Sequence, residues 1–181
     1  MSLWPSNALP IDWTYAEWKR SPYAGEGTTC QNCHMAVYEG TAAPGAPVRS
    51  LHRHNFPGGG DLSLVTKTAE IKLTLFPHFA GTEIEARVEN VKAGHAFPTG
   101  NATAPVVSLV LHAYDDSATE IYTSKRDFRV VYVDASGKVT RDPTTAADIQ
   151  SDTTLQPREP RKERFFIPRR LKATHVKAEL I

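Results

Sequence analysis

Sulfur-containing residues are scarce in this chain, whose 181 residues include two cysteines and two methionines. Two cysteines cannot form the multiple disulfides that stabilise many small secreted domains. The fold must therefore depend on a hydrophobic core, which a single domain of this length can bury. Both cysteines lie in one segment, Cys30-Gln31-Asn32-Cys33-His34, so the chain has no cysteine left for a disulfide framework elsewhere.

Long apolar runs and a strong net charge are also absent. No segment reaches the roughly 18 apolar residues of a membrane span, and a net charge of +1 disfavours a nucleic-acid partner. The largest local imbalance lies in residues 157–172, which contain seven basic and two acidic residues. We interpret this run as solvated strand faces; the alternative is a docking surface for an acidic redox partner.

The segment from Cys30 to His34 has the C-x-x-C-H pattern of covalent haem attachment. Two cysteine sulfurs at this spacing can form thioethers to the two vinyl groups of one porphyrin. The adjacent histidine then lies under the ring, where its imidazole can bind the iron. The pattern predicts one covalent haem c per chain, bound by Cys30 and Cys33 with His34 as proximal ligand. A redox dithiol and a zinc site completed by two further histidines are the alternatives.

The second axial ligand of such a haem is predicted to be a histidine or to be missing. Met35 is adjacent to His34 and cannot reach the opposite face of the ring, and the other methionine is terminal. Two other histidines, His54 and His95, are each followed closely by Phe, Pro and Gly. Glycine allows a backbone to approach a flat macrocycle, and proline stiffens the loop. We therefore predict His54 or His95 as alternative distal iron ligands.

Alternation of polar and apolar residues dominates the chain after residue 61 and predicts β-strands. The strand candidates are residues 70–75, 83–89, 106–114, 129–133, 164–167 and 174–181. Turn-forming residues, Asp115-Asp116 and Ser136-Gly137, separate some of them. Six or seven short strands predict a mainly β fold, an antiparallel immunoglobulin-like β-sandwich over residues 61–181. His112 and His175 fall on the polar side of their strands and are predicted to lie at the surface.

Residues 1–60 differ in character, because they contain both cysteines, all three tryptophans and many glycines and prolines. We predict a haem-binding N-terminal segment with one short helix near residues 14–20. Thr14 and Glu17 match the capping-box pattern S/T-x-x-E, and Pro22 would end the helix.

Taken together, these segments resemble bacterial multihaem c-type cytochromes. In that family a C-x-x-C-H-M haem site precedes a β-rich domain with a G-H-x-x-P-T-G loop. The matching segments here are Glu17-Trp18, Cys30–Met35, His54–Gly59, Asn90–Gly100 and Asp152–Glu159. The resemblance runs through roughly residues 12–181, and the loop is its most particular part. The chain departs from the family in having a single haem motif.

The resemblance implies an exported electron carrier, periplasmic or extracellular, with bis-His haems packed close enough for electron hopping. It implies redox partner proteins, in particular other c-type cytochromes. Residues 1–10 lack the features of a signal peptide, so we expect that a leader has been removed. His34 would be the proximal ligand, with His54 and His95 as candidates for the distal position.

Electron transfer is therefore the expected function, and enzymatic activity is not expected, because an iron held by two histidines has no open coordination position. Two alternatives remain. The β-sandwich could be a structural or assembly module stapled by haem or zinc. A five-coordinate haem would instead bind gases or catalyse, although Arg53 is the only basic residue in the cluster around His54.

Overall fold

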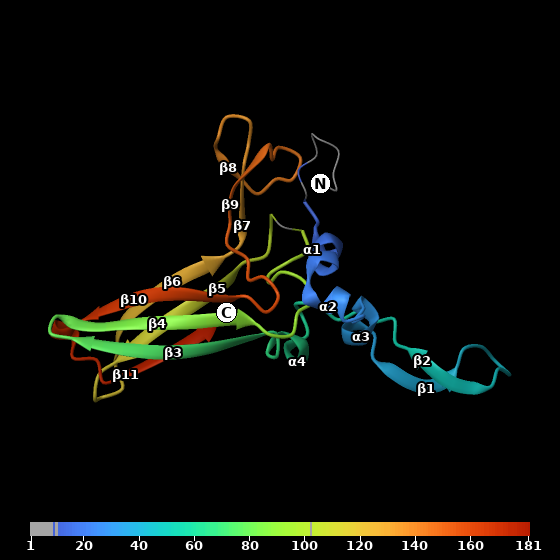
Figure 1. Ribbon diagram of the computed structural model, residues 1–181, viewed down its shortest axis with the longest axis horizontal. Coiled ribbons are helices and arrows are strands. Elements are labelled where there is room, and N and C mark those ends of the chain that lie inside the picture. The colour runs from blue at the N-terminus through green and yellow to red at the C-terminus, as the bar shows by residue number, and fades with distance from the viewer. Residues whose placement is uncertain (1–8, 10, 102) are drawn as a thin grey trace.

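Two three-stranded antiparallel sheets form the body of the protein, which we describe from a computed structural model covering residue 9, residues 11–101 and residues 103–181 (Figure 1). One sheet has the order β10-β4-β3 and the other the order β11-β5-β6. Their bounds are β3 (Ala69–His78), β4 (Gly81–Asn90), β5 (Val107–Tyr114), β6 (Glu120–Phe128), β10 (Pro160–Pro168) and β11 (His175–Leu180).

The core lies between these two sheets, and the alternation of the sequence explains it. Ile84 and Val88 from β4 meet Leu109 and Leu111 from β5, and all four are fully buried. Side chains at alternate positions share one face of a strand, so each strand contributes a row of apolar groups. Burying each such side chain contributes about 1.5–3 kcal/mol. The mainly β, antiparallel prediction is confirmed; the immunoglobulin-like arrangement stays a prediction.

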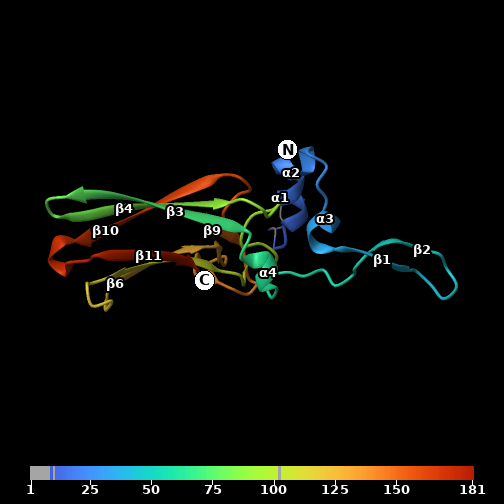
Figure 2. The ribbon, with the colours of Figure 1, turned by 90° about the horizontal axis from the view of Figure 1, so that it is seen from below.

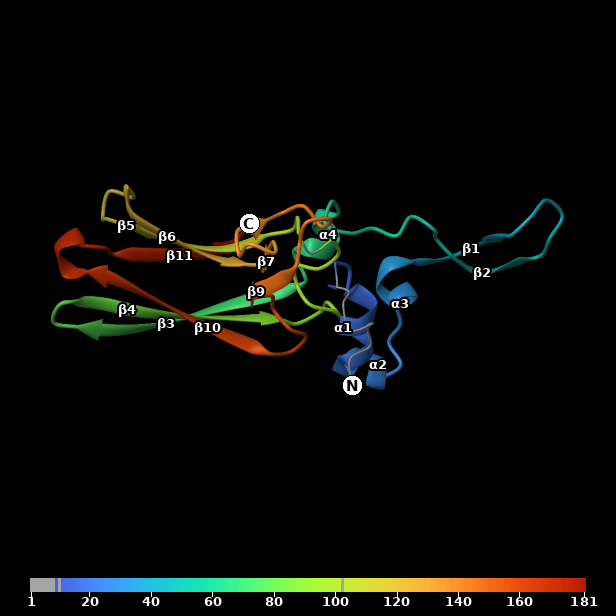
Figure 3. The same ribbon diagram turned by 90° about the horizontal axis from the view of Figure 1, so that it is seen from above.

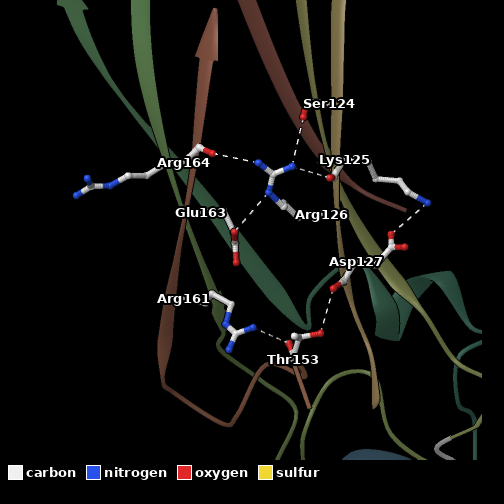
Figure 4. Close-up of polar contacts among 8 residues, drawn as sticks. All are labelled: Ser124, Lys125, Arg126, Asp127, Thr153, Arg161, Glu163 and Arg164. Carbon is white, nitrogen blue, oxygen red and sulfur yellow. Dashed lines mark hydrogen bonds and ion pairs between the residues drawn. The ribbon is translucent and has the colours of Figure 1, made fainter. Parts of the chain in front are cut away.

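Strand β6 was missed by the sequence analysis because its polar residues hide the alternation. Figure 4 shows that β6 and β10 are bridged by polar contacts at the open side of the sandwich. The guanidinium of Arg126 lies 4.9 Å from the centre of the Phe165 ring and 3.8 Å from the Glu163 carboxylate. From β10, Arg161 covers Phe128 and donates a hydrogen bond of 3.1 Å to the Thr153 carbonyl. Arginine stems therefore close the edge of the core, where a hydrophobic residue would give a clearer pattern.

A small third sheet, of order β8-β7-β9, lies beyond one end of the sandwich. Its strands are β7 (Val130–Val133), β8 (Val139–Thr140) and β9 (Asp148–Asp152). The chain continues from β9 to Leu155, which pairs with Phe97 through reciprocal backbone hydrogen bonds of 2.8 and 2.9 Å. This pairing joins the segment before β10 to the loop that follows β4.

The N-terminal part lies at that same end of the sandwich (Figure 2). Its elements are α1 (Thr14–Arg20), α2 (Pro22–Gly25), α3 (Cys30–His34), β1 (Val37–Thr41), β2 (Val48–His52) and α4 (Leu62–Val65). Strands β1 and β2 form an antiparallel hairpin that extends away from the body (Figure 3), which the sequence did not indicate. No helix in the described ranges is long and apolar enough to cross a membrane. The boundary proposed between residues 60 and 61 stays a prediction.

The helix expected at residues 14–20 is present, but the predicted capping box is wrong. The N-cap is Trp13, and no side chain caps the helix there. The Thr14 hydroxyl instead bonds Asp12 and Thr99, at 3.1 and 2.9 Å. The carboxylate of Glu17 is directed to the loop after β4. The pattern misled because a tertiary partner outcompetes the local backbone for these polar side chains.

His112 lies on the outer face of its strand, as expected, but it is not freely exposed. Its side chain is 15% exposed and lies between the carboxylates of Glu120 and Glu179, at 2.9 and 3.3 Å. His175 is exposed. Both histidines lie on the β11-β5-β6 sheet, away from the N-terminal segment.

Candidate functional site

The C-x-x-C-H segment forms the short helix α3, which begins after Thr29. The Asn32 side chain accepts the Thr29 backbone N–H at 2.7 Å and its hydroxyl at 2.8 Å, which satisfies groups at the helix start. Residues three apart share a helix face, so Cys30 and Cys33 lie side by side. Both are exposed, free thiols, accessible to covalent attachment.

The imidazole of His34 is held by the loop after β2. Its Nδ1 is 2.5 Å from the carbonyl oxygen of Pro57. A carbonyl can only accept a hydrogen bond, so Nδ1 is the protonated nitrogen and Nε2 keeps a free lone pair. A metal-binding histidine commonly donates its other ring N–H in this way. The Phe56 ring stacks on His34, with ring centres 4.8 Å apart and planes inclined by 14°.

The β1–β2 hairpin brings Pro57 back to His34, from which it is 23 positions distant in sequence. Two contacts close the base of the hairpin. The Arg53 backbone N–H donates to the Ala36 carbonyl at 2.9 Å, and His52 Nδ1 is 2.8 Å from the Met35 carbonyl. His34 and His52 therefore each direct Nδ1 to a backbone carbonyl at the base of the hairpin.

The structure places His95 next to His34. The centres of the two imidazole rings are 6.2 Å apart, with planes inclined by 21°. His95 Nδ1 is 2.8 Å from the Ala96 carbonyl, so its Nε2 also keeps a lone pair. The other candidate, His54, is exposed. It has no hydrogen bond, ion pair or ring contact with any residue of the described ranges.

A buried amide, Asn90, fixes the loop that carries His95. Asn90 is fully buried at the end of β4. Its Nδ2 donates to the carbonyls of His95 and Leu155, at 2.8 and 3.2 Å. Its Oδ1 accepts the Ala93 N–H at 3.0 Å. All three hydrogen bonds of the Asn90 amide are therefore made to the loop that carries His95 or to Leu155, which pairs with that loop. The sequence analysis gave Asn90 no role, although it opens the segment that carries the family resemblance.

Helix α1 holds the same loop from the other side through Glu17. One carboxylate oxygen of Glu17 accepts the Ala96 N–H at 3.1 Å and the Thr99 hydroxyl at 2.6 Å. Burial raises the pKa of Glu17 above its usual value, although these two hydrogen bonds act in the opposite direction. The bond to Ala96 lies one residue after His95, so α1 restrains the position of that imidazole.

Aromatic side chains of the N-terminal segment cover the start of the loop. Gly94 lies close to two of these side chains: a Cβ at this position would be 3.3 Å from Tyr23 and 3.4 Å from Trp18. The Tyr23 hydroxyl donates to the Val91 carbonyl at 2.6 Å, and the Trp18 indole donates to the Thr28 carbonyl at 2.8 Å. A side chain at position 94 would therefore require Tyr23 to shift by a few tenths of an ångström.

Replacing Glu17 with glutamine should change how stability depends on pH. Because its pKa is raised in the fold, the folded protein keeps this proton to a higher pH than the unfolded chain. The contribution of Glu17 to stability therefore falls as pH rises from about 4.5 through its folded pKa. Denaturation at several pH values should show Glu17→Gln gaining stability relative to wild type over that range.

Glu26 provides the control for this measurement. A hydrogen bond from Arg158 lowers the pKa of Glu26, so its stabilising contribution is lost as pH falls. The Glu26→Gln variant should show the opposite trend relative to wild type. If the stability of Glu17→Gln and of wild type changed with pH in the same way, a raised pKa of Glu17 in the fold would be contradicted.

The alternatives to haem are less well supported by this geometry. The described ranges contain no group of three or more His, Cys, Asp or Glu side chains that could hold a metal ion. A closed zinc site needs four such ligands, so Cys30, Cys33 and two histidines do not assemble one. A c-type haem needs two thiols and an axial imidazole, and these residues fit it.

Comparison with known proteins gives one informative similarity. No protein-family model matches the chain, and no curated protein sequence matches it. The structure is similar to that of a penta-heme cytochrome c552 from Thermochromatium tepidum, with a TM-score of 0.73 and 25% sequence identity. The match covers 94% of this chain and 42% of that protein, so the chain spans less than half of its length. The similarity supports a relationship to multihaem c-type cytochromes.

Proposed function

We propose that this chain is a c-type cytochrome domain that transfers electrons through one covalent haem. Cys30 and Cys33 would hold the porphyrin by thioethers, with His34 and His95 as axial ligands. The similarity to a penta-heme cytochrome supports haem c as the cofactor and an electron carrier as the class of function. Haem iron supplies a one-electron couple whose potential depends on its axial ligands.

One observation carries the choice of His95 over His54. The ring centres of His34 and His95 are 6.2 Å apart. With metal–nitrogen distances of about 2 Å, two imidazoles on opposite sides of one metal ion have ring centres roughly 6 Å apart. In both histidines Nδ1 is engaged by a backbone carbonyl, which leaves each Nε2 for the iron.

The protein's part in this function is to hold two imidazoles in place and to leave no open coordination position. Two imidazoles give a lower potential than a histidine and a methionine. Pro57 and Phe56 hold the proximal ring, whereas Asn90 and Glu17 hold the backbone on either side of His95. This double restraint suits an electron carrier, because a ligand that stays in place limits structural change between oxidation states.

The partners would be redox proteins, in particular other c-type cytochromes, in the periplasm or outside the cell. The similar structure is that of a penta-heme cytochrome, and the match covers 42% of the length of that protein. This chain has one C-x-x-C-H motif, so we propose one haem for it. We also propose that residues 1–60 form the haem segment and residues 61–181 an immunoglobulin-like sandwich, supported by the two facing antiparallel sheets.

Optical spectroscopy tests the proposal directly. Protein produced with haem-attachment machinery should give a c-type pyridine haemochrome that survives denaturation. The spectra should be low-spin in both oxidation states and indifferent to carbon monoxide. Replacing Cys30 and Cys33 together with serine should abolish the covalent haem, whereas replacing the remote, exposed His175 with alanine should leave it intact. Wild-type protein without covalent haem would overturn the proposal, and carbon monoxide binding would indicate an open site.

A further inference from the structure

The end of the sandwich opposite to the helical segment is formed by the β3–β4 turn and the connection from β10 to β11 (Figure 1). It combines exposed aromatic side chains with exposed basic ones. We call this end the distal tip and define it as residues 76–81 and 166–172. The first stretch is the β3–β4 turn, and the second contains the 3-10 helix η1 (Arg169–Leu171). The Arg169 N–H donates to the Ala80 carbonyl at 2.9 Å, so the two stretches are directly joined.

Three phenylalanine side chains are exposed at this tip. Phe79, at the turn itself, is 91% exposed. Phe76 and Phe166 lie on either side of Glu83 on the outer face of the sheet, and both remain almost half exposed. Exposed apolar side chains that gather on one part of a surface commonly mark an interaction site.

Unpaired positive charge accompanies these aromatic residues. Arg169, Arg170 and Lys172 are exposed and form no ion pair with any residue in the described part of the chain. Earlier in the same basic run, cations on β10 have carboxylate partners. Lys162 pairs with Glu85 at 2.8 Å, and Arg164 with Glu83 at 3.4 Å. The basic run therefore divides into a balanced strand face and an unbalanced tip.

An open hollow of about 200 Å³ lies between the two stretches of the tip. His78, Arg169 and Lys172 contribute to its lining, and no acidic residue does. A phosphate group would find two permanent cations there, together with a histidine that can donate a hydrogen bond.

We propose that the distal tip docks on the surface of a bilayer that contains anionic lipid. Phe79 inserts at the headgroup boundary, and Arg169, Arg170 and Lys172 bind lipid phosphates. Interfacial anchoring commonly needs two signals of this kind, an apolar insertion and a basic patch. The nearly complete exposure of Phe79 also favours a deformable lipid surface, since a protein partner would need a pocket matched to this side chain.

Docking at this tip would leave the candidate haem site accessible. Helix α3 and the hairpin lie at the other end of the long axis (Figures 2 and 3). When the distal tip contacts the bilayer, the candidate haem segment faces away from the lipid and is accessible to redox partners in solution. The inference does not depend on the proposed haem chemistry, because the tip contains none of the candidate haem ligands.

Vesicle co-sedimentation of the full chain tests this inference. Phosphatidylcholine vesicles with phosphatidylglycerol should bind the protein at low salt, whereas phosphatidylcholine alone should not. Replacing Arg169, Arg170 and Lys172 together with serine should weaken binding about 100-fold, at about fivefold per basic residue. Phe79→Ser should weaken it about tenfold. Asp116→Asn should strengthen it, because this exposed carboxylate lies in the β5–β6 turn at the same end.

Matched controls separate the tip from bulk charge. Replacing Lys19, Lys138 and Arg141 with serine removes the same charge from α1 and the β8 region and should change binding only slightly. Equal loss in both triple variants would overturn the inference, as would failure of wild type to bind anionic vesicles. Thermal stabilisation by inorganic phosphate without binding to vesicles would indicate a site for small anions and would overturn the inference. Binding to polyglutamate without vesicle binding would indicate an acidic protein partner and would also overturn it.

Discussion

Replacing His95 with alanine is expected to convert the haem from low-spin to high-spin and to allow carbon monoxide to bind. The proposed iron ligation uses His34 and His95, whose ring centres are 6.2 Å apart. Removing one imidazole leaves an open coordination position, which spectroscopy detects in both oxidation states. His54→Ala should keep the low-spin spectrum, because His54 is exposed and has no contact of its own at the site.

His95→Met separates ligation from a structural role of this residue. A methionine at this position can still bind iron, and exchange of imidazole for thioether should raise the reduction potential. A side chain that only packed in the loop would leave the potential almost unchanged. A high-spin spectrum for His54→Ala, with a low-spin spectrum for His95→Ala, would reverse the assignment of the distal ligand.

Asn90→Ala is expected to destabilise the fold by about 2 kcal/mol or more, because it leaves two backbone groups, the His95 carbonyl and the Ala93 N–H, without their hydrogen-bond partner. The Leu155 carbonyl loses one of its two hydrogen bonds and keeps the one from the Phe97 N–H. Urea denaturation should show a lower midpoint with an unchanged slope. Loss of this clamp should also broaden the haem spectrum, because the His95 loop becomes less restrained.

Two further variants test whether hydrogen bonding is the cause. Asn90→Asp keeps the size and the acceptor for Ala93 but places a carboxylate against two carbonyl oxygens, so it should be at least as destabilising as alanine. Asn55→Ala removes an exposed amide and should change stability by less than about 0.5 kcal/mol. A loss below about 1 kcal/mol in Asn90→Ala would show that water replaces the amide.

The elements that could be predicted are those with strong local signals. Strands β3, β4, β5 and β11 alternate clearly, and their buried faces are the apolar ones. Strand β6 escaped prediction because Arg126 occupies an inward-facing position at the sandwich edge. The capping box at Thr14 failed for a related reason, since its polar groups have partners that are distant in sequence.

The candidate site divides in the same way. The sequence by itself determined the C-x-x-C-H motif, because it depends on five consecutive residues, whereas the helix that these residues form was seen only in the structure. The sequence also limited the second ligand to a few histidines. The choice of His95 that we propose depends on tertiary structure alone, since the approach of His95 to His34 depends on the pairing of β4 and on the return of the β1–β2 hairpin.

Tertiary structure also decided which polar groups matter. Asn90 and Glu17 resemble ordinary strand and helix residues in the sequence, yet both are directed to the loop of His95. Likewise, the basic run became a balanced strand face and an unpaired tip only when β10 paired with β4. Local patterns depend on neighbouring residues, whereas a ligand pair, a buried clamp or a charged surface depends on which distant residues the fold brings together.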